Sequence, residues 1–136
     1  MVGILVITHY NLGTELIAAA EMIGGKIECI QAVSVDPKKD TEKLRKEISL
    51  AIKKLDSGNG VLILTDMFGG TPSNLSLSFL EDGKVEVLTG VNLPMLIKVS
   101  TYRDKKTLND FATQLQSFGK KNINLASEII RKKIDE

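Results

Sequence analysis

The chain has 136 residues, of which 43% are hydrophobic and 26% charged, values typical of a soluble globular protein with one domain. Its 18 Lys and Arg nearly balance its 17 Asp and Glu, and the resulting formal charge of +1 argues against nucleic-acid binding as the main function. The chain has one cysteine, Cys29, and one histidine, His9. These counts exclude a disulfide framework, a thiolate zinc cluster and a single-chain site with two imidazoles.

The sequence also lacks the signs of a membrane-spanning or secreted protein. No apolar run approaches the roughly 18 residues that span a bilayer. The N-terminus lacks the charged region, apolar stretch and cleavage site of a signal peptide. We therefore expect a cytoplasmic protein that forms one domain over residues 1–136, with its lone cysteine reduced.

Four short apolar runs predict β-strands, in chain order Val2–Thr8, Ile27–Val35, Gly60–Asp66 and Lys84–Thr89. The first and third runs are almost uninterrupted, as expected of parallel strands that are covered on both faces. The second ends at Asp36-Pro37, because proline cannot continue a central strand. Cys29 falls within this second run, which predicts a place in the core. The fourth alternates in part, which favours an edge position.

Helical patterns fill the gaps between these strands. Apolar residues recur at helical spacing from Leu12 to Ile23 and from Leu44 to Leu55, and glycine-containing turns follow both segments. Thr71-Pro72 predicts the start of a third helix, since threonine serves as an N-cap and proline suits the first turn. A stripe from Leu108 to Ile134 stays roughly in phase past Gly119 and predicts one long C-terminal helix.

The alternation of strands and helices predicts a doubly wound α/β fold, with a mainly parallel sheet and helices on both faces. The natural strand order is 2-1-3-4, which places the first and third strands side by side, about 4.8 Å apart. In such sheets, ligands bind beyond the carboxyl ends of the strands, near the switch in strand order. We therefore expect the functional site at that edge.

Two polar residues end neighbouring strands at this edge. His9 directly follows the first strand, and Asp66 closes the third. A carboxylate that accepts a hydrogen bond from one ring nitrogen fixes the histidine tautomer and leaves the other nitrogen free as a nucleophile or base. The alternative is a strand-end histidine that only satisfies a neighbouring group, which is the usual role of a lone histidine.

A glycine-rich turn after Asp66 favours the functional interpretation. The run Asp66-Met-Phe-Gly-Gly-Thr-Pro-Ser-Asn74 leads from the third strand through Gly69 and Gly70 to the expected helix start at Thr71. Glycines let the backbone approach a ligand closely, and a helix start offers unpaired N–H groups, so the turn suits an anion such as a phosphoryl group on His9. A tight turn with a capping threonine explains the same residues equally well.

Three other kinds of site fit the sequence less well. The first strand is not followed by the Gly-x-Gly-x-x-Gly pattern of a dinucleotide-binding fold. A Ser-His-Asp hydrolase needs a serine beside His9, and Ser73, the nearest candidate, lacks a nucleophile elbow. An aspartyl-phosphate receiver domain would use Asp66, but the first strand ends in Thr8-His9 and not in the carboxylates that hold Mg²⁺.

Three motifs stand in a distinctive order: Ile7-Thr8-His9, the run from Leu64 to Asn74, and Thr89-Gly-Val-Asn-Leu-Pro-Met-Leu96. Together they resemble the mannose-family EIIA component of the bacterial phosphotransferase system, over nearly the whole chain. The resemblance implies a phosphotransferase that accepts phosphate from phospho-HPr and passes it to an EIIB domain or subunit, usually in sugar uptake. Membrane permease components would be met only indirectly, and no cofactor or metal is expected.

The resemblance also implies roles for single residues. His9 corresponds to the phosphorylated histidine and Asp66 to its orienting carboxylate, while Thr71 matches a hydroxyl residue near the phosphoryl group. Gly69 and Gly70 complete the expected phosphoryl-binding turn.

Tyr10, Met67 and Phe68 flank this turn and predict an apolar docking surface, since exposed apolar residues near a site often mark a protein interface. Packing of Phe68 beneath the turn is an equally good interpretation. The family commonly has glycine directly after its active histidine, where this chain has Tyr10, and this difference bears on partner access.

The family is typically a homodimer whose subunits exchange a strand. The candidate here for an antiparallel exchanged edge strand is Lys98 to Thr101, a stretch that also fits a helix. An alternative function is a regulatory module whose phosphorylation state at His9 controls binding to another protein, without a role in transport.

Overall fold

The computed structural model describes residues 1–135 and centres on one four-stranded sheet. Its strands are β1 (Gly3–His9), β2 (Ile30–Val35), β3 (Val61–Thr65) and β4 (Val85–Thr89). All three pairings are parallel, in the order β2-β1-β3-β4, so the predicted order is confirmed. Because β1 pairs with β3 from Gly3↔Val61 to Ile7↔Thr65, the carboxyl ends of these two strands meet at one edge.

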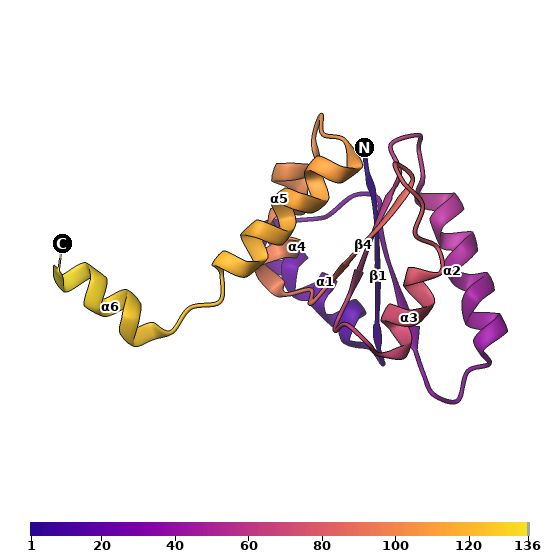
Figure 1. Cartoon of the computed structure of the whole chain (residues 1–136), viewed down its shortest axis with the longest axis horizontal. Helices are drawn as coiled ribbons and strands as arrows, with labels where there is room; N and C mark the ends of the chain where they lie inside the picture. The colour runs from indigo at the N-terminus through magenta and orange to yellow at the C-terminus, as the bar shows by residue number, and fades with distance from the viewer. Residues whose placement is uncertain (136) are drawn as a thin grey trace.

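Helices cover both faces of the sheet, as predicted for a doubly wound fold. They are α1 (Leu12–Gly24), α2 (Thr41–Leu55), α3 (Thr71–Leu77), α4 (Leu93–Arg103), α5 (Leu108–Lys121) and α6 (Ala126–Asp135). Figure 1 shows α1, α4 and α5 on one side of the sheet and α2 and α3 on the other. The helix α6 lies apart from both layers.

The central strand β1 explains why the sheet needs two helical layers. Its side chains alternate between two apolar clusters: Ile4 and Val6 pack on the side of α4 and α5, and Leu5 and Ile7 on the side of α2. All four are fully buried, and burying each contributes about 1.5–3 kcal/mol. Both faces are therefore dry, and polar chemistry is confined to the sheet edges.

The second strand is shorter than the sequence predicts. β2 begins at Ile30 instead of Ile27, because Cys29 adopts a left-handed conformation with φ of 54°, which a strand residue cannot adopt. The expected place of Cys29 within a strand is therefore wrong. Its side chain is half-buried and packs against the apolar cluster on the α2 side.

The segment from Lys98 to Thr101 lies within α4, and every strand of the sheet is parallel, so the candidate exchanged strand is wrong. The side chain of Asn92 caps this helix by accepting a hydrogen bond from the N–H of Met95 at 3.1 Å, and Pro94 lies in the first turn. Leu96 and Val99 are fully buried at helical spacing, which fixes the segment as a helix against the core.

The single long C-terminal helix is also wrong. Gly119 does lie inside α5, but that helix ends at Lys121, where Asn122 donates from its backbone N–H to the carbonyl oxygen of Gly119 at 3.3 Å. Four residues then lead to α6, of which no residue is buried. The apolar spacing continues in the sequence beyond Lys121, although no residue of α6 is buried against the rest of the chain. Hydrophobic spacing alone therefore could not show where α5 ends.

Within residues 1–135, no helix has both the length and the apolar character needed to cross a membrane.

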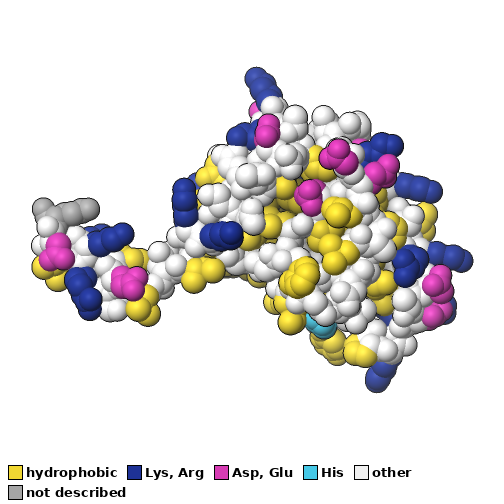
Figure 2. Space-filling model, viewed as in Figure 1, with side chains coloured by type: hydrophobic (Ala, Val, Ile, Leu, Met, Phe, Trp, Pro, Cys, Tyr) yellow, Lys and Arg dark blue, Asp and Glu magenta, His cyan; other side chains and the backbone are white. Residues whose placement is uncertain are grey.

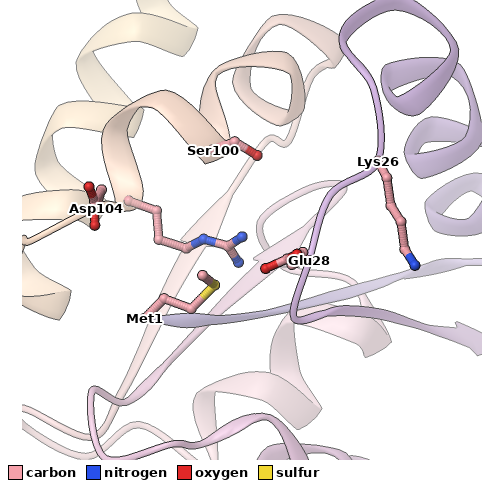
Figure 3. A pocket seen from close by; sticks show the side chains of 6 residues that line it. Met1, Lys26, Glu28, Ser100 and Asp104 are labelled. Carbon is pink, nitrogen blue, oxygen red and sulfur yellow. The ribbon is translucent and has the colours of Figure 1, made fainter.

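A buried arginine holds the edge of the sheet opposite the carboxyl ends. Arg103, the last residue of α4, is 3% exposed, and its Nη1 donates to the carbonyl oxygens of Val2 at 3.2 Å and Cys29 at 3.4 Å. Burial lowers the pKa of its guanidinium, although an arginine stays protonated in proteins. α4 is thereby tied to the residues that lead into β1 and β2. Arg103 also borders a pocket of about 300 Å³, shown in Figure 3, with the other lining residues Met1, Lys26, Glu28, Ser100 and Asp104.

We expect Arg103→Met to lower the free energy of unfolding by about 1–3 kcal/mol, because the buried carbonyl oxygen of Val2 loses its side-chain donor. Chemical denaturation followed by circular dichroism measures this change. Lys46→Met, an exposed position on α2, serves as the control and should change stability by less than about 0.5 kcal/mol. Equal stability of the Arg103→Met protein and the wild type would contradict a structural role for the arginine.

Candidate functional site

His9 and Asp66 meet at the carboxyl edge of the sheet, where β1 and β3 end side by side. The Nδ1 atom of His9 lies 2.8 Å from Oδ2 of Asp66, and the same oxygen accepts the backbone N–H of His9 at 2.9 Å. The other carboxylate oxygen, Oδ1, accepts the N–H of Met67 at 3.1 Å. The prediction that these two side chains lie within hydrogen-bonding reach is confirmed.

This contact determines which nitrogen of His9 is free. An ionised carboxylate only accepts hydrogen bonds, so Nδ1 carries the proton and Nε2 of the neutral ring keeps its lone pair. The side chain of His9 is 49% exposed, whereas that of Asp66 is 11% exposed. The ring of His9 is therefore half exposed, and the carboxylate that orients it is shielded.

The ionised form of Asp66 is stabilised by His9. Burial by itself raises the pKa of the carboxyl, but hydrogen bonds from the backbone N–H and ring of His9, together with their Coulombic attraction, outweigh burial and lower the pKa below 3.8. Asp66 is therefore negatively charged throughout the neutral pH range. A fixed negative charge beside Nδ1 can offset positive charge that develops on the ring.

The backbone of Gly70 packs directly against the free side of the ring. A Cβ atom at this position would lie 2.7 Å from Cε1 and 3.1 Å from Nε2 of His9, so a larger residue would displace the imidazole. Gly69, with φ of 93°, gives the preceding turn a conformation that favours glycine. The two glycines thus bring the start of α3 next to Nε2.

Thr71 is the first residue of α3, and Gly70 is its N-cap, one position earlier than the sequence predicts. The carbonyl oxygen of Gly70 accepts the first helical hydrogen bond, from the N–H of Asn74 at 2.9 Å. No side chain caps this helix, so the hydroxyl of Thr71 is not used as a cap. The predicted capping role of Thr71 is therefore wrong.

A pocket of about 270 Å³ opens beside the ring, and we call it the His9 pocket. It lies between the loop that follows β2 and the start of α3, and it is lined by His9, Val35, Asp36, Pro37, Lys39, Thr41, Leu44 and Thr71. The loop after β2 reaches the site because Val35 pairs with His9 across the sheet. This loop was not among the predicted parts of the site, although it follows a strand that ends at the same edge.

Apolar side chains surround His9 on the protein surface. Tyr10 is 67% exposed, Met67 54% and Phe68 73%, so Phe68 does not pack beneath the turn. Figure 2 shows the histidine bordered by hydrophobic side chains at this end of the molecule. Tyr10 has φ of 54°, a left-handed conformation that costs a non-glycine residue about 1–2 kcal/mol.

The arrangement of the described residues does not favour a Ser-His-Asp hydrolase or a metal-dependent receiver site. Ser73 is fully buried and its hydroxyl has no hydrogen-bond partner within the described residues, so it is not placed to act as a nucleophile beside His9. No group of three or more His, Cys, Asp or Glu side chains in residues 1–135 is arranged to hold a metal ion.

The chain matches the EIIA-man family, described as the PTS system fructose IIA component, over residues 3–116. The chain therefore belongs to this EIIA family. Membership supports a role as a phosphoryl carrier within sugar phosphotransferase systems. The match ends within α5, so α6 lies outside it.

Individual relatives agree with this assignment of the EIIA chain. It is 29% identical to the PTS system fructose-specific EIIA component of Bacillus subtilis (strain 168), over 97% of this chain and 91% of that protein. It is 34% identical to the PTS system mannose-specific EIIAB component of Escherichia coli (strain K12), over 76% of this chain but 32% of that longer protein. The phosphotransferase system component EIIA from Streptococcus agalactiae has the same fold, with a TM-score of 0.84 at 24% identity, over 94% of this chain and 99% of that one.

The low pKa of Asp66 predicts a pH-dependent difference between the wild-type EIIA chain and Asp66→Asn. A lowered folded-state pKa adds stability above the unfolded value of 3.8, and this stability is lost as the pH falls through the folded-state value. We expect the wild type to be the more stable at neutral pH, with the gap closing below pH 3.8. Urea denaturation of both proteins across this range measures the gap. Asp82→Asn, at an exposed position, is the control, and a constant gap for Asp66→Asn would contradict the ionic contact.

Proposed function

We propose that this chain acts as a single EIIA domain over residues 1–136 and carries a phosphoryl group on Nε2 of His9. It accepts the group from phospho-HPr and passes it to an EIIB domain or subunit of a sugar phosphotransferase system. The observation that carries this proposal is the hydrogen bond at 2.8 Å from Nδ1 of His9 to Asp66, which leaves Nε2 free on a half-exposed ring. Family membership supplies the reaction class.

The transfer needs only one covalent exchange at His9. The lone pair of Nε2 forms a bond to phosphorus as the bond from phosphorus to the donor breaks, and the electron pair of that bond leaves with the donor. The proton on Nδ1 stays in place, so the ring gains positive charge, which the carboxylate of Asp66 offsets. Phosphoryl transfer depends mainly on positioning and charge stabilisation, which is what this pair offers.

The turn of Gly69, Gly70 and Thr71 is proposed to receive the transferred group. The close approach of Gly70 to Nε2 supports this role, because it places main chain and not a side chain beside the reacting nitrogen. The hydroxyl of Thr71 lines the same pocket as His9 and is free of any capping bond. Together these groups offer hydrogen bonds to phosphoryl oxygens.

The apolar surface of Tyr10, Met67 and Phe68 is proposed as the docking site for both protein partners. Each of these residues is more than half exposed and lies within two residues of His9 or Asp66 in the sequence. Exposed apolar side chains gathered around a reactive group are typical of a protein interface.

We expect phosphoenolpyruvate, enzyme I and HPr to phosphorylate the wild-type chain at His9. Peptide mapping under alkaline conditions identifies the site, since phosphohistidine survives base. His9→Ala should take up no phosphate, and Asp66→Ala should take it up about 100-fold more slowly, because the ring loses its orientation. Gly70→Ala should also slow uptake, since its Cβ displaces the ring.

Three outcomes would contradict this proposal: phosphate on another residue, equal uptake by His9→Ala, or unchanged transfer rates in Asp66→Ala. Circular dichroism of each variant checks that the fold is retained. Addition of a purified EIIB domain then tests onward transfer. Uptake at His9 with no transfer to any EIIB domain encoded beside this chain would favour the regulatory alternative.

We also propose that the chain is a homodimer, with α6 packed against the second subunit. A helix of ten residues is marginal in water by itself, yet α6 buries none of its residues in one chain. α6 and the four residues before it expose large apolar side chains that a partner would cover, namely Ile123, Leu125, Ile129, Ile130 and Ile134. A second copy of this chain has the same helix, so α6 of each subunit would contact the other subunit in the same way.

Light scattering after size-exclusion chromatography tests the homodimer, and we expect the mass of two chains. The double variant Ile130→Gln, Ile134→Gln should shift the equilibrium toward the monomer, because it removes apolar area from the proposed interface. Lys132→Gln, on the opposite side of α6 by helical spacing, should leave the mass unchanged. A monomeric wild-type chain would contradict this proposal and leave the carrier function intact.

A further inference from the structure

The His9 pocket contains one basic side chain, and the proposed carrier function does not yet use it. Of the eight residues that line the pocket, only Lys39 is a lysine or arginine. It faces the same space as His9 and Thr71, from the opposite wall formed by the loop between β2 and α2. A cation at this place bears directly on the charge of a phosphoryl group.

The loop that holds Lys39 is fixed at both ends. The carboxylate of Asp36 accepts the N–H of Lys38 at 2.9 Å, and the carbonyl oxygen of Asp36 accepts the N–H of Lys39 at 2.9 Å. Asp40 then caps α2 by accepting the N–H of Glu42 at 3.4 Å. The backbone of Lys39 is therefore set between a closed turn and a helix start, and only its side chain is free to move.

The ammonium group of Lys39 is only weakly held. Its nearest partners are the carbonyl oxygen of Ser34 at 3.5 Å and the carboxylate of Glu47 at 3.7 Å, both long contacts. The side chains of Lys39 and Glu47 are 47% and 44% exposed, and exposed ion pairs of this kind contribute little. A lysine has three N–H donors on a flexible stem, so this ammonium can turn toward a stronger anion.

The charges around His9 create a need for such a cation. Asp66 hydrogen-bonds to Nδ1 of the ring, and Asp36 is among the residues that line the pocket, so two acidic residues already belong to this region. A phosphoryl group adds up to two further negative charges at this place. Thr41 and Thr71 offer hydroxyls but no charge.

We propose that Lys39 leaves Glu47 and binds the phosphoryl group on Nε2 of His9, stabilising both the group as it is transferred and the phosphorylated state. The proposal rests on the carrier function of His9 argued above. In this proposal the ammonium group of Lys39 contacts the transferred phosphate, although the loop between β2 and α2 that carries it is far from His9 in the sequence. Phosphorylation would then change the surface next to the docking site, because the contact between Lys39 and Glu47 is broken.

The test compares Lys39→Met with Lys38→Met, which removes the same charge one residue away and outside the pocket. Phosphorylation is started with phospho-HPr and, separately, with phosphoramidate, a small donor that needs no protein docking. We expect Lys39→Met to slow uptake from both donors about tenfold. This is less than the 100-fold or more of an enclosed charge-stabilising group, because solvent and salt screen a half-exposed lysine. Lys38→Met should match the wild type.

Two further measurements separate charge stabilisation from a structural role. The pH midpoint of the phosphoryl ³¹P shift should rise in Lys39→Met, since a nearby cation favours the dianion, and Lys39→Arg should return it toward the wild-type value. The difference in rate between Lys39→Met and the wild type should shrink in high salt.

Equal rates with phosphoramidate would overturn the proposal, and so would an unchanged ³¹P midpoint. A loss seen only with phospho-HPr would make Lys39 a docking residue, which also overturns it. If the wild type takes up phosphate from phosphoramidate but not from phospho-HPr, the carrier function fails while the role of Lys39 is still decided by the small donor. A wild-type chain that neither donor phosphorylates at His9 overturns both.

Discussion

The arrangement of the site depends on one carboxylate oxygen. Oδ2 of Asp66 accepts hydrogen bonds from both the backbone N–H and the ring Nδ1 of His9, at 2.9 and 2.8 Å. The first bond lies just past the last β1–β3 pair, Ile7↔Thr65, and the second fixes the plane and tautomer of the imidazole. Both require β1 and β3 to be neighbours, which the strand order β2-β1-β3-β4 provides. The topology of the sheet and the chemistry of the histidine are therefore linked through a single atom.

The environment of the ring is different on each side. Gly70 closes one side, with its backbone so near that no Cβ could be accommodated. The other side opens into the His9 pocket, whose walls come from the loop after β2 and the start of α3. The residues that follow His9 and Asp66 in the sequence, namely Tyr10, Met67 and Phe68, expose apolar side chains to solvent. The ring is held firmly, while the space next to Nε2 stays open to a ligand or a partner protein.

Much of this architecture follows from local sequence patterns, because a buried parallel strand needs a continuous apolar run and a helix needs an apolar stripe. The strand order, the two helical layers and the approach of His9 to Asp66 were predictable for this reason. The errors lie where distant contacts decide the local structure. Cys29 is left-handed beside the buried Arg103, and the stripe through Ile123 continues past the end of the protein body. The loop that carries Lys39 was not predicted to border His9, because the prediction rested on the ends of β1 and β3 alone, although β2 ends at the same edge.

Only one nitrogen of His9 is accessible, and this limits the order of events in a carrier. A group that arrives on Nε2 must also depart from Nε2, through the same opening, because Nδ1 is occupied by Asp66. Donor and acceptor proteins would therefore compete for one footprint and could not bind at the same time. Turnover then requires each complex to dissociate quickly, which favours small, weak interfaces over extensive ones. A tightly bound partner would act as an inhibitor of such a relay.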